Sequence, residues 1–177
     1  MITNNFKKVL GLMLECHATQ TTGIVSVKNL AGETKYASTP WATQSFPNSV
    51  SKGLSLNNVT GGLLIGSGAT APTANDYNLS NRITSGVSTV SPTTQYGVDE
   101  NGNPYLIIIW VLTNNTASDI TISEVGYAQY LKGSSTLNGN ANDTVVMLFD
   151  RTLLDEALVL PANGAGVLKY TLKTIIS

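Results

Sequence analysis

The sequence predicts an all-β protein: an antiparallel β-sandwich, immunoglobulin-like or of a related type, with a short helix at its N-terminus. Charged residues make up only 12% of the 177-residue chain, and short neutral polar residues are abundant. This composition suits strands and turns better than solvent-facing helices, which are usually rich in Glu, Lys and Arg. Short apolar runs recur at roughly 8 to 15 residue spacing with polar turns between them, as in sandwiches. The length fits one well-buried core.

A helix is expected over residues 4 to 18, where apolar side chains recur at three- and four-residue spacing behind polar N-cap candidates. The chain therefore divides into an N-terminal helical arm, residues 1–22, and a sandwich domain, residues 23–177. The helix must bury its apolar stripe, either on its own sandwich or on a neighbouring chain, and the sequence leaves both alternatives open. The stripe consists of Phe6, Val9, Leu10 and Met13.

Strands are expected from residue 23 onward because the pattern changes to short β-branched and aromatic runs. The run 105–113 is apolar on both faces, which predicts a central strand covered by the opposite sheet on one side and by the helix or a long loop on the other. The expected strands are 24–28, 34–37, 62–66, 86–90, 105–113, 120–130, 144–149, 157–160 and 167–176. The expected core includes Leu106, Ile108, Trp110, Leu112, Val125, Met147, Phe149 and Leu172.

Two irregular segments are also predicted. Residues 39–58 form a long loop that contains Trp41 and Phe46 among neutral polar residues, and loops of this length are commonly functional or part of an interface. Trp41 has two alternatives, sugar stacking or anchoring a protein interface. Before the central strand, Asn101 and Gly102 are expected to supply the positive φ angles of a hairpin turn.

Residues 66 to 71 fit the loose glycine-rich pattern of dinucleotide-binding loops. That chemistry requires a helix that starts at the loop, so that its unpaired N–H groups face the phosphates. Pro72 and the turn residues after it oppose such a helix. The sequence therefore predicts a structural turn here and no nucleotide site.

The chain offers little for catalysis. Its one histidine, His17, is next to its one cysteine, Cys16, and neighbours on a helix do not face each other. We therefore expect no enzymatic activity, no metal site and no cofactor; scattered carboxylates such as Glu124 and Asp150 leave a small hydrolase as the weakest alternative.

The charge and hydropathy patterns also limit the partners. Net charge is −1 with single, dispersed charges, which predicts no nucleic-acid partner. No apolar run reaches the roughly 18 residues of a membrane span, so a soluble protein without a membrane partner is expected. The single cysteine fits a protein made in a reducing cytoplasm.

Four charged residues interrupt apolar or turn segments: Asp76, Arg82, Glu124 and Arg151. At least one pair of an acid and an arginine among them is expected to fix a loop against a strand. The alternative is that all four are solvated at the surface, where isolated pairs contribute little.

Three stretches, together covering about residues 60 to 176, carry a resemblance to a known class of proteins. They are GSGATAPT with DYNL (66–73 and 76–79), ITISEVGY (120–127), and FDRT leading to LPANG (149–152 and 160–164). In this order they resemble small virion structural proteins of tailed bacteriophages, encoded among head, neck and tail genes. The resemblance implies a β-sandwich that works by assembly and has no chemistry of its own.

The expected function is therefore that of a non-enzymatic virion component, made in the cytoplasm of the host bacterium, that forms homo-oligomers and docks to other virion proteins. Interface cores are poor in charge, as this chain is. The alternative is a carbohydrate-binding host-attachment module with a glycan contact at Trp41 and either Tyr77 or Tyr96. The expected assembly interface comprises Phe6, Val9, Leu10, Met13, Trp41 and Phe46.

Overall fold

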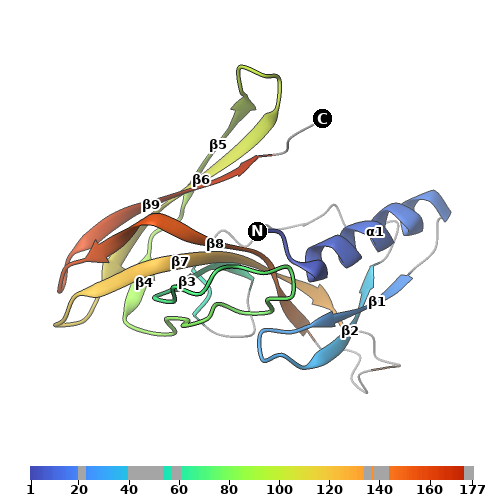
Figure 1. Cartoon of the computed structure of the whole chain (residues 1–177), viewed down its shortest axis with the longest axis horizontal. Helices are drawn as coiled ribbons and strands as arrows, with labels where there is room; N and C mark the ends of the chain where they lie inside the picture. The colour runs from blue at the N-terminus through green and yellow to red at the C-terminus, as the bar shows by residue number, and fades with distance from the viewer. Residues whose placement is uncertain (20–22, 40–53, 57–60, 134–136, 138–143, 174–177) are drawn as a thin grey trace.

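The computed structural model describes residues 1–19, 23–39, 54–56, 61–133, 137 and 144–173; for residues 13–19, 39, 132, 172 and 173 it describes the backbone alone. These residues form one helix, α1 (Asn4–Thr19), and nine strands (Figure 1). The strands are β1 (Gly23–Lys28), β2 (Thr34–Thr39), β3 (Gly62–Gly66), β4 (Val87–Thr89), β5 (Thr93–Val98), β6 (Pro104–Asn114), β7 (Ile120–Lys132), β8 (Thr144–Leu160) and β9 (Ala165–Lys173).

The strands pair antiparallel in three sheets. One is the β1–β2 hairpin, and the second has the order β3-β7-β8. The third is built around β6: β9 pairs with residues 105–113 of β6, so β4 and β5 must share the other side of that strand. The fold class is thus as predicted: all-β, with antiparallel sheets packed together in a sandwich-like arrangement and one short helix.

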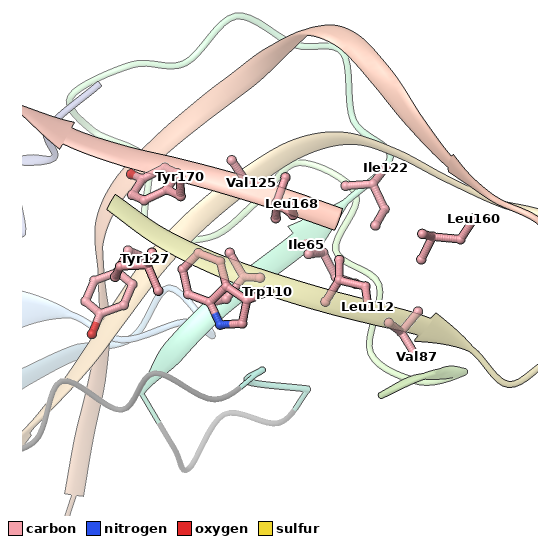
Figure 2. Close-up of a cluster of buried hydrophobic side chains, with 12 residues drawn as sticks. Ile65, Val87, Trp110, Leu112, Ile122, Val125, Tyr127, Leu160, Leu168 and Tyr170 are labelled. Carbon is pink, nitrogen blue, oxygen red and sulfur yellow. The ribbon is translucent and has the colours of Figure 1, made fainter. Parts of the chain in front are cut away.

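The main core lies between the β3-β7-β8 sheet and the β6 sheet. Trp110 is fully buried at its centre, with its ring 6.4 Å from the ring of Tyr170 on β9. Figure 2 shows side chains of β6, β7 and β9 converging on this region. Of the predicted core residues, this cluster buries Ile108, Trp110, Leu112 and Val125, and Leu106 packs at its margin. Alternate residues of β6 point inward, as the period of a strand requires.

A second cluster joins the helix to the strands. Val9 is fully buried with Val25 of β1 and Met147 of β8, and the ring of Phe6 meets that of Phe149 edge-on at 5.1 Å. Met147 and Phe149 are thus buried, as predicted, whereas the side chain of Leu172 lies outside the described residues. The helix packs on its own chain, which is one of the two alternatives that the sequence left open.

Three features differ from the sequence-based predictions. β5 was not predicted, and the expected strands 144–149 and 157–160 are parts of one continuous strand, β8. The helix does not cover the outer face of β6, because it packs on β1, β2 and β8 instead. On that outer face Val111 is 41% exposed. The predicted cover of β6 by the helix is therefore wrong. The alternative cover was the long loop 39–58, most of which lies outside the described residues.

Of the two residues expected to supply positive φ angles in the turn between β5 and β6, only Gly102 does so. Gly102 has a φ of +80°, but Asn101 does not have a positive φ. The carboxylate of Asp99 organises the turn by accepting hydrogen bonds from the N–H groups of Asn101 (2.9 Å) and Asn103 (2.8 Å). One left-handed residue is sufficient because this side chain satisfies the backbone donors of the turn.

Candidate functional site

A long connection between β3 and β4, residues 67–86, covers the face of the β3-β7-β8 sheet that is turned away from the main core. Leu64 points to this face because its neighbours on β3, Leu63 and Ile65, point into the main core. Under the connection, Leu64 packs with Leu79 and with residues of β7 and β8. The connection begins with the glycine-rich stretch that resembles a phosphate-binding loop.

Glu124 of β7 lies beneath this connection and is fully buried. Its carboxylate accepts hydrogen bonds from the backbone N–H groups of Gly68 (3.1 Å), Ser80 (3.1 Å) and Asn81 (2.7 Å). The glycine-rich stretch therefore directs one of its N–H groups, that of Gly68, onto a carboxylate of its own chain. This explains how a sequence with a phosphate-loop pattern forms a structural turn, as predicted.

Arg151 of β8 completes the arrangement. Its Nε donates to Glu124 Oε2 (2.9 Å), one terminal nitrogen donates to Asp76 Oδ2 (2.6 Å), and the other donates to the carbonyl of Thr70 (2.8 Å). Asp76 in turn accepts a hydrogen bond from the N–H of Thr73 (2.9 Å). We call Asp76, Glu124 and Arg151 the clamp. The prediction of an acid and arginine pair that fixes a loop against a strand is confirmed, with two acids instead of one.

Glycines make the room that the clamp needs. A Cβ on Gly68 would lie 1.8 Å from Ser80 Oγ and 2.3 Å from Glu124 Oε1, so no larger residue fits there without a shift of the loop. Gly126 of β7 is the cross-strand partner of Arg151. A Cβ on Gly126 would lie 2.9 Å from the carbonyl of Asp150 and 2.9 Å from the side chains of Leu148 and Leu79, so this position also has no room for a side chain.

The clamp is ionised at neutral pH. Burial alone would raise the pKa of Glu124, but the N–H groups of Asn81 and Ser80 and the Arg151 guanidinium outweigh burial, and the pKa is lowered. Burial would also raise the pKa of Asp76, but hydrogen bonds from Thr73 and Arg151 outweigh burial, and the pKa of that carboxyl is lowered. A buried carboxylate held ionised by five donors is suited to anchoring a loop and is poorly suited to exchanging protons with a substrate.

Arg82, the fourth predicted charge, lies outside the clamp. One of its terminal nitrogens donates to the carbonyl of Ser55 (3.0 Å), and the N–H of Ser55 donates to the carbonyl of Leu63 on β3 (2.8 Å). Burial lowers the pKa of Arg82. Arg82 thus links residues 54–56 to the connection and contributes to the same covering layer by a separate contact.

The predicted assembly interface requires correction. Val9 is fully buried against Val25 of its own chain, so it is not available to a second chain, whereas Phe6, which packs against Phe149, is half-buried. Leu10 is 41% exposed and remains accessible. The side chain of Met13, together with Trp41 and Phe46, lies outside the described residues. The stripe was interpreted as one unit, but the helix turns only part of it toward the strands.

Trp41 of the expected glycan contact lies outside the described residues, and its two alternative partners, Tyr77 and Tyr96, are on different parts of the fold. The ring of Tyr77 lies against Gly32 in the β1–β2 turn, with Lys28 Nζ 5.4 Å from its centroid. Tyr96 is on β5, where it faces Leu106 across the strand pair and is 87% exposed. The structure therefore does not bring these two tyrosines together.

Few sequence patterns predict the most exposed apolar feature of the molecule. β5 with residues 104–109 of β6 and 169–173 of β9 forms a structure that extends beyond the rest of the molecule (Figure 1), and we call it the wing. Tyr96 (87% exposed) and Val98 (63%) lie on β5, and Val167 (61%) and Val111 lie beside its base. The predicted turn at residues 99–103 implied a hairpin, but the mixed composition of β5 concealed its first strand.

The clamp and the wing are the two features that stand out chemically. Within the described residues, no three or more His, Cys, Asp or Glu side chains gather into a group that could hold a metal ion. Within the same residues, no helix combines the length and the apolar character needed to cross a membrane. Comparison with protein-family models, with curated proteins and with solved structures gives no match for this chain.

Proposed function

We propose that this protein is a non-enzymatic structural subunit of a tailed-bacteriophage virion, which acts by assembling with copies of itself and by docking to other virion proteins. The observation that carries the assembly role is the wing. It extends from the body (Figure 1). Its residues Tyr96 and Val98 are exposed to solvent. Large apolar side chains gathered on one exposed feature are typical of protein contact sites.

The virion part of the proposal depends on the sequence resemblance. The first stretch supplies Gly68 and Asp76, the second supplies Glu124, and the third supplies Arg151, so the residues that carry the likeness also build the clamp. The likeness therefore concerns a device that stabilises the fold, as expected of a structural protein. It concerns no site for chemistry.

Sedimentation velocity over a wide concentration range, with negative-stain images of the same samples, tests the assembly role. We expect oligomers that grow with concentration and images of rings, trimers or fibres. A monomer at every concentration would overturn the assembly role. A monomer that binds a glycan array would favour the carbohydrate-binding alternative, with Tyr96 as its exposed aromatic residue.

The virion role has a separate test. Particles are purified on a density gradient from cells that produce the phage carrying this gene, and the protein is quantified by mass spectrometry in particles and in the soluble lysate. We expect the chain in the particles at a fixed ratio to the major capsid protein. Its presence in the lysate without any in the particles would contradict the virion role and leave the assembly role standing.

A further inference from the structure

β5 is an edge strand without the usual protection against pairing. Its six residues, Thr93–Val98, pair with β6 in a regular register and include no charged residue and no proline. Natural edge strands are commonly protected by lysine, proline or a bulge, because their unpaired N–H and C=O groups accept another strand. Among the described strands, β6 alone pairs with β5, so the other edge of β5 offers these groups to a partner.

The opposite edge of the same sheet is protected. β9 (Ala165–Lys173) has the exposed Lys169 at its midpoint. Antiparallel pairing of β9 with its copy about that midpoint would place two lysines directly opposite each other, which destabilises a strand pair. The contrast between the two edges indicates that pairing is resisted at β9 and permitted at β5.

We infer that β5 is the edge through which two copies of this chain pair, in an antiparallel arrangement about a two-fold axis near Gln95 and Tyr96. This inference specifies the contact of the assembly role proposed above and depends on it. The charges next to β5 favour this orientation. Asp99 and Glu100 follow the strand directly, and antiparallel pairing places these acids at opposite ends of the pair, whereas parallel pairing would bring them beside their copies.

The side chains of β5 suit this arrangement. A two-fold axis perpendicular to the sheet keeps equivalent side chains on the same face, so Tyr96 of one copy lies beside or diagonal to Tyr96 of the other. Aromatic side chains contribute most strongly among cross-strand pairs, and these two are 87% exposed in the single chain. The two β6 sheets become one continuous sheet, whose outer strands are the lysine-bearing β9 of each copy. Pairing therefore stops at two copies along this direction.

The test uses opposite charges at Gln95, whose side chain is at or next to the axis. In Gln95→Lys and in Gln95→Glu, like charges approach across the two-fold, and each homodimer is expected to weaken about fivefold or more. A mixture of the two variants brings opposite charges together and is expected to restore a mixed dimer. Sedimentation equilibrium gives the dissociation constants, and circular dichroism confirms that each variant is folded.

Thr171→Lys is the matched control. Thr171 and Gln95 flank the same residue, Ile107, on the two sides of β6, so the control adds the same charge to the same sheet face at the protected edge. It should leave the dimer unchanged. Three outcomes would show that β5 is not the contact: the wild type and the Gln95 variants associate equally, the mixture forms no mixed dimer, or Thr171→Lys weakens the dimer as much as the Gln95 variants do. Each of these outcomes leaves the assembly role standing. A wild type that is monomeric throughout overturns both.

Discussion

At the scale of single residues, the clamp shows how a fully buried carboxylate becomes compatible with a β-sandwich. Burying the Glu124 carboxylate without hydrogen-bond partners or a counter-charge would strongly destabilise the fold, because moving a charge out of water is unfavourable. Three backbone N–H groups and the Arg151 guanidinium surround it, so its oxygens are satisfied from the loop above and from the neighbouring strand. The stability of the loop therefore depends on each member being present.

Removing the cation should be strongly destabilising. Arg151→Ala leaves Glu124 buried without its counter-charge, and we expect a loss of about 3 to 5 kcal/mol in the free energy of unfolding, measured by urea denaturation. Lys35→Ala is the control, because Lys35 forms an exposed pair with Glu33 (3.5 Å). That change should cost no more than about 1 kcal/mol. Equal losses in the two variants would contradict the anchoring role of the clamp.

The clamp also predicts a pH dependence. Folding lowers the pKa of Asp76 from its ordinary value of 3.8. The ionised carboxylate therefore contributes its full stabilisation of the fold above pH 3.8, and this stabilisation is lost as the pH falls through the lower pKa of the folded state. The stability gap between wild type and Asp76→Asn should therefore narrow as pH falls below about 4. Urea titrations at several pH values measure the gap. A gap that is constant with pH would exclude the linkage.

Glycine at position 68 should be required for packing. Gly68→Ala places a methyl group 1.8 Å from Ser80 Oγ, and the loop must move away from Glu124 to admit it. We expect a loss of about 1 to 3 kcal/mol, as for other overpacked sites. Gly11→Ala is the control: no atom lies within 4 Å of a Cβ there, and alanine in a helix is favoured by about 0.5 to 1 kcal/mol over glycine. Thermal unfolding should move in opposite directions in the two variants.

At the scale of elements, the helix is part of the sandwich. Val9 fills a site between β1 and β8, whereas its neighbour Leu10 points outward and is 41% exposed. Val9→Ala should therefore cost about 2 kcal/mol, and Leu10→Ala less than about 0.5 kcal/mol. Chemical denaturation of both variants measures the difference. If Leu10→Ala is the more damaging change, the orientation of the helix is wrong.

Strong local patterns made several elements predictable, and partners distant in sequence determined the others. The apolar run of β6 required burial in any compact fold, and the helical spacing of Phe6 and Val9 fixed α1. β8 was predicted as two strands because Asp150 and Arg151 begin a polar interruption. Arg151 is tolerated in the strand because its side chain reaches Glu124, which is two residues from its cross-strand partner Gly126 on β7, and one sequence gives no direct sign of that pairing.

The candidate sites were likewise predictable only where the local sequence pattern was strong. Charge in an apolar setting was enough to predict that an acid and an arginine would pair, but the second acid depended on how residues 67–86 fold back. β5 was missed because Gln95 and Gly97 interrupt its strand-favouring residues, which therefore form no continuous apolar run. Its strand character depends on pairing with β6, which is a tertiary effect.

At the scale of the whole molecule, burial is unevenly distributed. The two larger sheets enclose Trp110 and its neighbours, whereas β5 and the turn after it extend outward (Figure 1). Residues 93–103 include no buried side chain. Regions with few buried contacts open most readily. The molecule thus combines a stable body with a weakly supported edge.

Hydrogen exchange measured by mass spectrometry should reveal this division. In dilute samples, amides of residues 93–98 should exchange much faster than those of residues 122–128, because β5 lies at an edge and β7 lies between two strands. At concentrations where the protein associates, exchange in β5 should slow while exchange in β9 stays unchanged. Equal slowing of β5 and β9 would indicate a contact that is not centred on β5.

The separation of the clamp residues along the chain has a consequence for biosynthesis. Asp76 and Arg151 are 75 positions apart, and Glu124 and Arg151 are 27 apart. During translation, the glycine-rich loop and Glu124 leave the ribosome before the arginine that neutralises them, so the connection over β3 cannot lock until β8 has been made and has paired with β7. Emergence of β8 from the ribosome therefore decides when this layer closes. A ribosome-bound chain that ends before residue 151 would hold an acidic, open loop.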